Sequence, residues 1–488
     1  MIEVKINDES FAYDIHSLIQ AFYPGVEVQV RAKEEFTGDT PLKMEAFVDE
    51  QEIRFAILED GRPCQEGSAR VEDPERKALK NQMKRLLYEK LCAYTGKKLP
   101  WGTLTGIRPV KIPMAMLEAG RSNLEIARYM WETYDCSKEK AALAISIANR
   151  EREVLEGLDY ENGWSLYVGI PFCPSICLYC SFSSSPIKLW EKRVEDYLDA
   201  LFKELDFLGR AYADRKLNTI YIGGGTPTTL NASQLDRLLG HIGKCFDFSH
   251  LRELTVEAGR PDSVSPEKFR VLKAHGVTRI SINPQTMNQK TLELIGRKHT
   301  AEQIKEAFHM AREAGFDNIN MDLIVGLPGE GIEDVRHTME ELRTLDPDSI
   351  TVHSLAVKRA ARLKLFRDTY EEMGFQNSQE IMDLTYRYCV EQGAYPYYLY
   401  RQKNMAGNFE NVGYAKDRKA GIYNILIMEE KQTILAAGAG ASSKFVFAAD
   451  HIERVENVKD VAQYIDRIDE MIERKRSFME AHGLLEQS

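Results

Sequence analysis

The chain has 488 residues, of which 43% are hydrophobic and 28% are charged, and its formal net charge is −11. This length and composition are typical of a globular protein with two or three domains. The acidic balance argues against unspecific nucleic-acid binding, because such binding depends on basic side chains that neutralise phosphates.

The start of the chain, MIEVKINDES, has neither the basic beginning nor the apolar core of a signal peptide. No apolar run approaches the ~20 residues that a membrane-spanning helix needs. We therefore expect a cytoplasmic protein without a membrane span.

Residues 1–160 mix short strand-like runs with helices, which predicts an N-terminal α+β domain. The expected elements are a hairpin over 43–50 and 52–62, a basic amphipathic helix over 69–96, a Gly- and Pro-rich loop over 100–112 and a helix over 137–158. The basic helix suggests a binding face, but charge runs are more often solvated, so we favour a solvated face.

Residues 161–365 alternate between strand-like and helix-like segments, and this alternation predicts parallel β/α units. The expected strands cover residues 165–172, 218–225, 253–259, 279–285, 318–328 and 349–357, and the expected helices cover 194–209, 233–246, 266–276, 301–315 and 333–345. Six units indicate an α/β fold with a partial, open (β/α)6 barrel. In such folds the chemistry takes place at the carboxyl ends of the strands.

Residues 366–488 are expected to form a small C-terminal α+β extension that covers the barrel. Its predicted elements are a helix over 378–393, a strand over 395–402, a hairpin over 423–441 and a C-terminal helical stretch.

Three of the eight cysteines crowd into the sequence PFCPSICLYCSF, as Cys173, Cys177 and Cys180. Three thiolates on one short loop can hold three irons of a four-iron, four-sulfur cluster and leave the fourth iron open. Zinc is the alternative, but a structural zinc site normally takes four ligands, and no further Cys or His lies nearby in the sequence. The other cysteines are scattered singly, as Cys64, Cys92, Cys136, Cys245 and Cys389.

Glycines and polar residues follow at the ends of the expected strands. The second strand ends in GGGTPT (223–228), where glycine lets backbone groups approach a ligand closely. Further candidate residues follow along the later strands: Glu257, Gln285, Arg297, Asp322 and Ala356. A single residue of this kind is more often an ordinary structural or surface residue, but the order of these residues along successive strand ends favours one shared site.

The three-cysteine loop after a first barrel strand resembles the radical S-adenosylmethionine (SAM) superfamily. The resemblance implies a 4Fe-4S cluster whose open iron binds SAM through its amino and carboxylate groups. One electron from the reduced cluster would cleave SAM to methionine and a 5′-deoxyadenosyl radical, which takes a hydrogen atom from the substrate. An electron donor such as flavodoxin or ferredoxin is also implied.

Over residues 165–445 the chain is most similar to the oxygen-independent coproporphyrinogen III oxidase group, which shares the Tyr-x-x-x-PFC sequence and the GAGA run at 438–441. The segments WGTLTGIRPVK, EAGRPD and SLAVKRAARLK resemble its HemZ-type branch. The resemblance implies that cluster-bound SAM contacts Tyr167, Gly224 and Glu257, and we also expect Gly225 and Ala356 among the cofactor-binding residues. It places a neighbouring pocket, where the oxidase holds a second SAM, at Tyr179, Thr226, Gln285, Arg297 and Asp322.

The chain also departs from the patterns of this group. The oxidase has a fourth cysteine where Phe182 stands and a histidine where Gly169 stands. The heme-chaperone branch has an HN-x-x-YW element, which reads Tyr-Asn-Ile-Leu from Tyr423 here, and its GAGAHS sequence appears as GAGASS with Ser442. These departures remove candidate heme ligands and leave decarboxylation open.

A basic cluster after the sixth strand favours an anionic substrate, because arginine pairs well with carboxylates such as the propionates of a tetrapyrrole. Its residues are Lys358, Arg359, Arg362 and Lys364. The alternative is an ordinary basic surface. Our first hypothesis is anaerobic oxidative decarboxylation of coproporphyrinogen III to protoporphyrinogen IX, or a related tetrapyrrole reaction. The alternatives are a heme-binding or heme-delivery protein that retains the cluster, and a radical SAM enzyme with another substrate.

Overall fold

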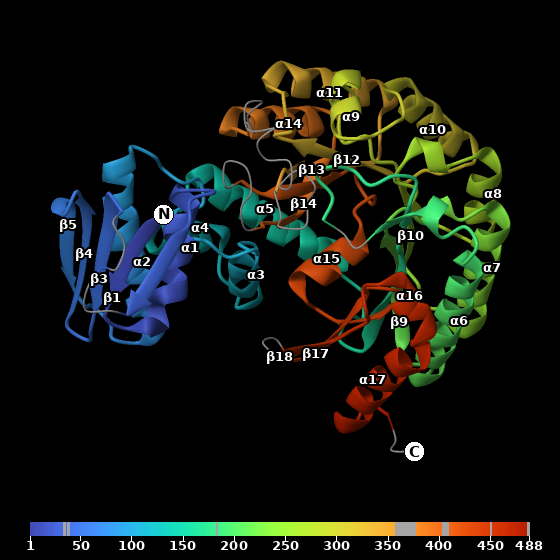
Figure 1. Cartoon of the computed structure of the whole chain (residues 1–488), viewed down its shortest axis with the longest axis horizontal. Coiled ribbons are helices and arrows are strands. Elements are labelled where there is room, and N and C mark those ends of the chain that lie inside the picture. Colours follow the sequence, from blue (N-terminus) through green and yellow to red (C-terminus); the bar gives the residue numbers. More distant parts are fainter. Residues whose placement is uncertain are drawn as a thin grey trace. The chain divides into compact units, whose positions relative to one another are not determined.

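The computed structural model describes residues 1–32, 36, 40–181, 184–356, 377–402, 409–448 and 451–485 (Figure 1). The chain divides into two compact units, one made of residues 1–149 with 399–410 and the other of residues 150–398 with 411–488. The three-domain division expected from the sequence stays a prediction. Within the described residues, no helix is both long enough and apolar enough to cross a membrane.

The first unit contains a five-stranded sheet in the order β2-β1-β3-β4-β5. Its strands are β1 (Ile2–Ile6), β2 (Val28–Ala32), β3 (Leu42–Val48), β4 (Glu52–Glu59) and β5 (Arg62–Arg70). The antiparallel pairing of β3 with β4 confirms the predicted hairpin. Helices α1 (Ala12–Phe22) and α2 (Arg76–Thr95) bury their apolar sides in one core with alternate strand residues. The basic stretch is thus a helix whose apolar side packs on the sheet.

The rest of the first unit is helical and includes the Gly- and Pro-rich loop. Its helices are α3 (Lys111–Glu118), α4 (Asn123–Tyr134) and α5 (Lys138–Leu155), of which residues 150–155 are counted with the second unit. Trp101 of the loop is fully buried and donates its indole N–H to Glu410 Oε2 at 2.7 Å. Lys140 Nζ lies 2.5 Å from the other oxygen of the same carboxylate. The buried carboxylate therefore joins the loop, α5 and the 399–410 segment.

The second unit is built on an 11-stranded sheet whose centre is six parallel strands in the order β13-β12-β11-β10-β9-β6. These strands are β6 (Gly163–Ile170), β9 (Lys216–Gly224), β10 (Glu253–Glu257), β11 (Arg279–Ser281), β12 (Ile319–Val325) and β13 (Ser349–Ser354). The connecting helices are α6 (Val194–Ala211), α7 (Ala232–Cys245), α8 (Pro266–Ala274), α9 (Gln289–Leu294), α10 (Ala301–Glu313) and α11 (Ile332–Leu345). The α/β partial (β/α)6 barrel expected from the sequence is confirmed.

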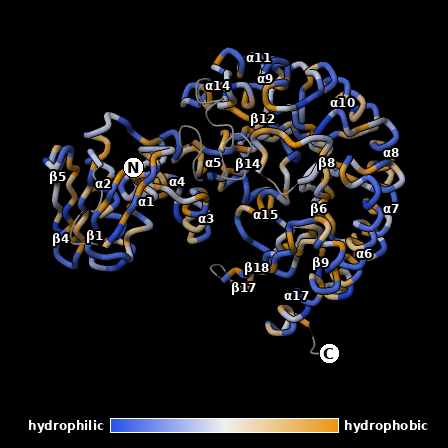
Figure 2. Tube along the Cα trace, viewed as in Figure 1, coloured by the Kyte–Doolittle hydropathy of each residue, from blue (hydrophilic) through white to orange (hydrophobic). Residues whose placement is uncertain are grey.

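Burial explains why these strands lack a polar alternation. Strand β10 is buried at four successive positions, because helices cover parallel sheets and both strand faces lose water. The connecting helices instead have one apolar side, and Figure 2 shows much of the length of α7, α8 and α10 in hydrophilic colours. The core of this unit therefore lies between the sheet and its helices.

The C-terminal residues extend the sheet at both edges. Strand β15 (Asn411–Ala415) pairs antiparallel with β13, and β14 (Tyr395–Tyr400) lies outside it. At the other edge β16 (Thr433–Ala437) pairs parallel with β6, followed by β17 (Ser442–Ala448) and β18 (His451–Glu456). The other α-helices of the described C-terminal residues are α14 (Gln379–Glu391), α15 (Ile422–Glu429), α16 (Val461–Asp466) and α17 (Ile468–Ala481).

The hairpin predicted over residues 423–441 is wrong. Its first half is helix α15, and its second half contains β16, which pairs with β6 and β17 and not with the residues of the first half. The backbone N–H groups of Ile422 and Tyr423 donate to the carboxylate of Glu253 at 2.7 and 3.3 Å, which satisfies the start of the helix. This cap comes from a residue far away in the sequence, so the local apolar pattern did not reveal the helix.

Candidate active site at the carboxyl ends of the barrel strands

The cysteine loop leaves the end of β6 and rests on the glycine-rich turn that follows β9. Gly225 N–H donates to Ile170 O at 2.8 Å, and Thr226 N–H donates to Phe172 O at 2.7 Å. The Thr226 hydroxyl donates to Cys173 Sγ at 3.6 Å. The first cysteine is therefore fixed against the turn. Burial raises the pKa of the Cys173 thiol, and the nearby Cys177 thiol adds to the increase.

The glycines of this turn make the close approach possible. A Cβ on Gly225 would lie 2.6 Å from Phe172 O and 3.0 Å from Cys173 Sγ. A Cβ on Gly223 would lie 3.1 Å from the Glu257 carboxyl group, and Gly224 has a φ of +108°, which L side chains rarely adopt. A side chain at any of these three positions would thus disturb the packing between the cysteine loop, β9 and β10.

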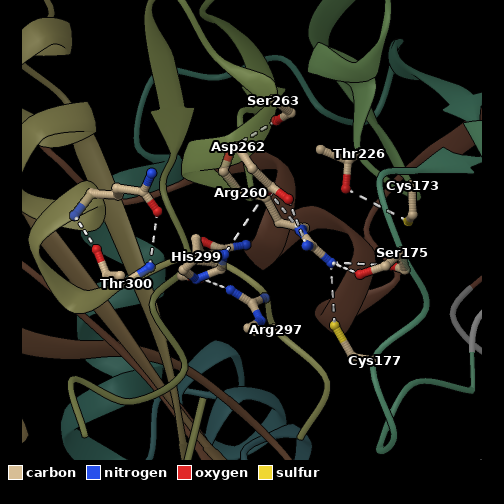
Figure 3. A network of polar contacts seen from close by, with 12 residues as sticks. Cys173, Ser175, Cys177, Thr226, Arg260, Asp262, Ser263, Arg297, His299 and Thr300 are labelled. Carbon is tan, nitrogen blue, oxygen red and sulfur yellow. Dashed lines mark hydrogen bonds and ion pairs between the residues drawn. The ribbon is translucent and has the colours of Figure 1, made fainter. Parts of the chain in front are cut away.

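Arg260 holds the middle of the cysteine loop, and Figure 3 shows its guanidinium pointing toward Ser175 and Cys177. Its Nη1 donates to Ser175 Oγ at 2.8 Å, to Ser175 O at 3.1 Å and to Cys177 Sγ at 3.9 Å. Asp262 accepts two further hydrogen bonds, at 2.9 and 2.7 Å. The side chain of Arg260 is only 3% exposed, so water screens its positive charge very little.

Arg260 was not among the site residues predicted from the sequence. It lies in the EAGRPD segment, three residues after Glu257, and it therefore follows the end of a barrel strand as the predicted residues do. This position after a strand end is the sequence feature that could have identified Arg260. Its pairing with Asp262 and its distance to Cys177 become visible only in the folded structure.

Arg297 and Tyr179 form a second contact with the cysteine loop. Arg297 donates to the Tyr179 hydroxyl at 3.2 Å and to Asn283 O at 2.5 Å. Next to it, His299 has a fully buried side chain, and burial followed by the Arg297 charge lowers its pKa to about 3, so the ring is neutral. Within the described part of the chain, Arg297 Nε and both His299 ring nitrogens are buried without a hydrogen-bond partner.

Glu257 ends β10 and is held by a tyrosine that sequence reasoning missed. The Tyr221 hydroxyl donates to Glu257 Oε1 at 2.5 Å, and the Tyr221 ring stacks on Tyr167 and Tyr423 with centroid distances of 6.2 and 4.6 Å. Burial raises the pKa of Glu257 to about 7, and the nearby Asp322 carboxylate also raises it. Glu257 therefore changes its charge near neutral pH.

Gln285, four residues after β11, comes together with Asp322, in the middle of the neighbouring strand β12. Gln285 N–H donates to Asp322 O at 2.9 Å, and Gln285 has a φ of +67°, which is uncommon for a residue with a side chain. Its side-chain Oε1 is buried and has no hydrogen-bond partner among the described residues. The Asp322 carboxylate accepts from Asn320 at 2.7 Å and lies 3.8 Å from His353 Nε2. A backbone conformation that is rare for glutamine and a buried amide oxygen without a partner thus coincide at Gln285.

Ala356 lies two residues beyond the end of β13. The basic cluster of Lys358, Arg359, Arg362 and Lys364 and the departure at Phe182 lie outside the described residues. The structure thus brings most of the predicted residues to one end of the sheet, in three groups: Cys173 with Gly225 and Thr226, Tyr179 with Arg297, and Tyr167 with Glu257, Gln285 and Asp322.

These residues fit an iron–sulfur cluster and a polar cofactor beside it. The loop supplies three thiols, the donor type that iron–sulfur clusters require. Glycine takes up no space where the loop and β9 approach most closely. Buried polar atoms of Gln285 and Arg297 lack partners in the described structure, and buried polar groups are normally satisfied, so a bound ligand would supply what is missing.

Comparisons with known proteins agree with this arrangement. The family model described as the radical SAM superfamily matches residues 167–342. The oxygen-independent coproporphyrinogen-III oxidase-like protein HemZ of Bacillus subtilis is 41% identical over 83% of this chain and 82% of its own length. The heme chaperone HemW of Bacillus subtilis is 40% identical over 40% of this chain and 51% of its own length.

Among solved structures, the coproporphyrinogen III oxidase HemN from Escherichia coli, described as a radical SAM enzyme, superimposes with a TM-score of 0.50 and 25% identity. The match covers 66% of this chain and 72% of that chain.

Proposed function

Because this chain belongs to the radical SAM superfamily, in the HemZ-type branch of the oxygen-independent coproporphyrinogen III oxidase-like group, we propose that it is an enzyme that oxidatively decarboxylates the propionates of coproporphyrinogen III or a related tetrapyrrole. The observation that supports this best is the shared strand-end site. It joins a three-thiol loop to buried polar groups that lack partners within the described residues.

In this proposal the chain holds a 4Fe-4S cluster on Cys173, Cys177 and Cys180. When bound, the cluster and SAM supply a strongly oxidising hydrogen acceptor. Each propionate that reacts would give one hydrogen atom, from the carbon next to the ring, to this acceptor, pass one electron to an external electron acceptor and release carbon dioxide. A vinyl group would remain in its place, and the other propionates would stay intact. The protein binds the substrate and protects the reaction from water.

Several residues would serve these tasks. Glu257, fixed by Tyr221, would accept hydrogen bonds from ligand hydroxyl groups. Arg297, fixed by Tyr179 and Asn283, would pair with a ligand carboxylate. An apolar cluster at the cysteine loop would exclude water; it consists of Ile295, Ile324, Leu327 and Leu355, with Leu178 and Tyr179 packed against it.

The similarity to heme chaperones supports a second candidate, a protein that binds heme and delivers it. Two positions argue against the idea that this chain binds heme with the residues that the chaperones use. Tyr423 is buried and stacks on Tyr221, and Ser442, which is exposed, replaces a histidine. The chaperone function therefore stays the second choice.

One experiment separates the two functions. Anaerobic incubation of the cluster-loaded chain with SAM, dithionite and coproporphyrinogen III, followed by mass spectrometry, should show loss of carbon dioxide and formation of 5′-deoxyadenosine. Stoichiometric heme binding without cleavage of SAM would favour the chaperone. Cleavage of SAM with intact coproporphyrinogen would refute the substrate and leave a radical SAM enzyme with another substrate.

A further inference from the structure

Helices α6 and α7 lie side by side on the outside of the barrel, and three metal-binding side chains meet where they pack (Figure 1). Asp206 lies on α6, and His241 and Cys245 lie four residues apart on α7. Residues four apart share one face of a helix, so the imidazole and the thiol point to the same side. One ligand atom of each residue lies within 4.8 Å of the others.

The separations of the donor atoms suit a small cation. His241 Nε2 lies 3.0 Å from Asp206 Oδ1, and Cys245 Sγ lies 3.3 Å from the same oxygen. Two ligands of a tetrahedral zinc ion lie roughly 3.3–3.8 Å apart, given zinc–ligand bonds of about 2.0–2.3 Å, so the two separations are equal to this range or slightly shorter. Small side-chain adjustments would therefore admit a zinc ion between these atoms.

The His241 imidazole is held in place by packing, but its Nε2 atom has no hydrogen bond to a described residue. Its Nε2 atom is shielded from solvent and has no hydrogen bond of acceptable geometry to any described residue, in spite of the short distance to Asp206. The ring stacks on Phe202 of α6, with centroids 4.3 Å apart and an angle of 18° between the planes. A buried nitrogen without a hydrogen bond calls for a ligand, because such atoms are normally paired.

The packing of the two helices makes this meeting possible. A Cβ on Gly209 of α6 would lie 2.7 Å from Cys245 O and 3.2 Å from Cys245 Cβ, so only glycine allows this approach. Cys245 is the last residue of α7, where the helix dipole favours a cation. Burial, and then Asp206, raise the pKa of the Cys245 thiol to about 12. A bound cation would reverse this effect by favouring the thiolate.

We propose that Asp206, His241 and Cys245 bind one zinc ion, with water as its fourth ligand. Thiolate, imidazole and carboxylate together are the donor types that zinc takes in proteins, and the partial exposure of Asp206 and His241 leaves access for water. Helix α6 follows the cysteine loop and α7 follows the glycine-rich turn, so the ion would tie together the two β/α units that carry the candidate active site.

The first test measures metal content and does not depend on activity. The cluster-loaded full chain is incubated with equimolar Zn²⁺, desalted and analysed for zinc and iron. We expect one zinc in addition to the cluster iron. His241→Gln and Cys245→Ser should each weaken zinc binding about a hundred-fold or more and leave the iron content unchanged. As a matched control, His275→Gln, in the neighbouring His275–Asp236 pair at 2.7 Å, should retain the zinc.

A second test needs no variant. Zinc should slow alkylation of Cys245 by N-ethylmaleimide about ten-fold or more, a chelator should restore the rate, and the exposed Cys64 should be labelled equally with and without zinc. Absence of zinc from the wild-type chain would overturn the proposal, and so would zinc binding that survives both substitutions. Equal labelling of Cys245 in both conditions would also overturn it.

Discussion

Two buried ionic networks in the second unit differ in how completely their polar atoms are paired. In the first, the side chains of Glu204 and Lys475 are fully buried and 2.7 Å apart. The other Glu204 contacts are Asn457 Nδ2 and Gly438 N–H, both at 2.9 Å, and the Tyr464 hydroxyl at 2.5 Å. The Glu204 carboxylate thus accepts four hydrogen bonds, from α17, α16, the GAGA turn and the residue that follows β18.

The second network surrounds the cysteine loop and is incomplete. Arg260 is paired with Asp262, whose side chain remains 29% exposed. In the same candidate site, Arg297 Nε, Gln285 Oε1 and both His299 nitrogens are buried and lack partners within the described structure. Burying unpaired polar atoms costs free energy, so a network that tolerates them has another task than stability. We infer that the complete network stabilises the fold and that the incomplete network is arranged for a ligand.

The largest effect is expected at the thiols of the incomplete network. Replacing Cys173, Cys177 and Cys180 together with Ala should abolish the cluster, whereas the wild-type chain should hold about four irons and four sulfides after anaerobic reconstitution. Iron and sulfide analysis measures this, and Cys64→Ser serves as the control with full iron. Iron retained in the triple variant would show that the ligand assignment is wrong.

The next effect should appear in the complete network. Lys475→Met leaves the Glu204 carboxylate buried without its counter-charge, which should lower the free energy of unfolding by about 3–5 kcal/mol. Urea unfolding measures the change. Lys203, whose exposed side chain lies 3.9 Å from Asp469, provides the matched control, and Lys203→Met should cost about 0–1 kcal/mol. Similar losses for both lysines would contradict the stabilising role of the buried pair.

A smaller effect is expected for SAM binding at Glu257. Glu257→Ala should weaken SAM binding about ten- to a hundred-fold, because it removes a charge-assisted hydrogen bond worth roughly 1.5–3 kcal/mol. Calorimetry on the cluster-loaded chain measures the affinity. An unchanged affinity in a folded, cluster-loaded variant would refute this role.

The pH dependence sharpens this assignment. The pKa of Glu257 is raised to about 7, so the carboxylate is protonated below that pH and charged above it. SAM should therefore bind more tightly at pH 8 than at pH 6 in the wild type, and Glu257→Gln should reduce this difference. The stability of the chain without cofactors depends on pH in the opposite direction and decreases as the pH rises. Protonated Glu257 stabilises the folded state at low pH, and this contribution falls as the pH rises from the unfolded pKa through about 7.

The smallest effect concerns the charge beside Cys177. Arg260→Gln removes a donor that lies 3.9 Å from Cys177 Sγ and a positive charge that would favour the reduced cluster. The reduction potential should fall, by about 60 mV if the interaction is worth roughly 1.4 kcal/mol to a one-electron couple. A redox titration followed by electron paramagnetic resonance measures this. Asp262→Asn, which keeps Arg260, controls for the lost ion pair; an equal shift in both variants would contradict a direct role for Arg260.

Much of this molecule could be predicted from local sequence signals. Alternation of strands and amphipathic helices indicated six parallel β/α units, because burial on both faces produces continuous apolar strands. The spacing of Cys173, Cys177 and Cys180 indicated a cluster loop, since all three donors lie in one short segment. Glu257, Gln285 and Asp322 could be placed together because the carboxyl ends of parallel strands share one edge.

Other features depended on contacts between distant segments. The sequence around Ile425 is compatible with strand or helix, and the Glu253 carboxylate at the start of α15 decided for the helix. Glu204 and Lys475 are 271 residues apart, and no local pattern shows that one will neutralise the other. The meeting of Asp206 with His241 and Cys245 likewise required the close packing of α6 and α7 at Gly209. Local sequence determines which elements form, whereas the pairing of buried charges and ligands depends on packing, because only packing removes the water that would otherwise solvate them.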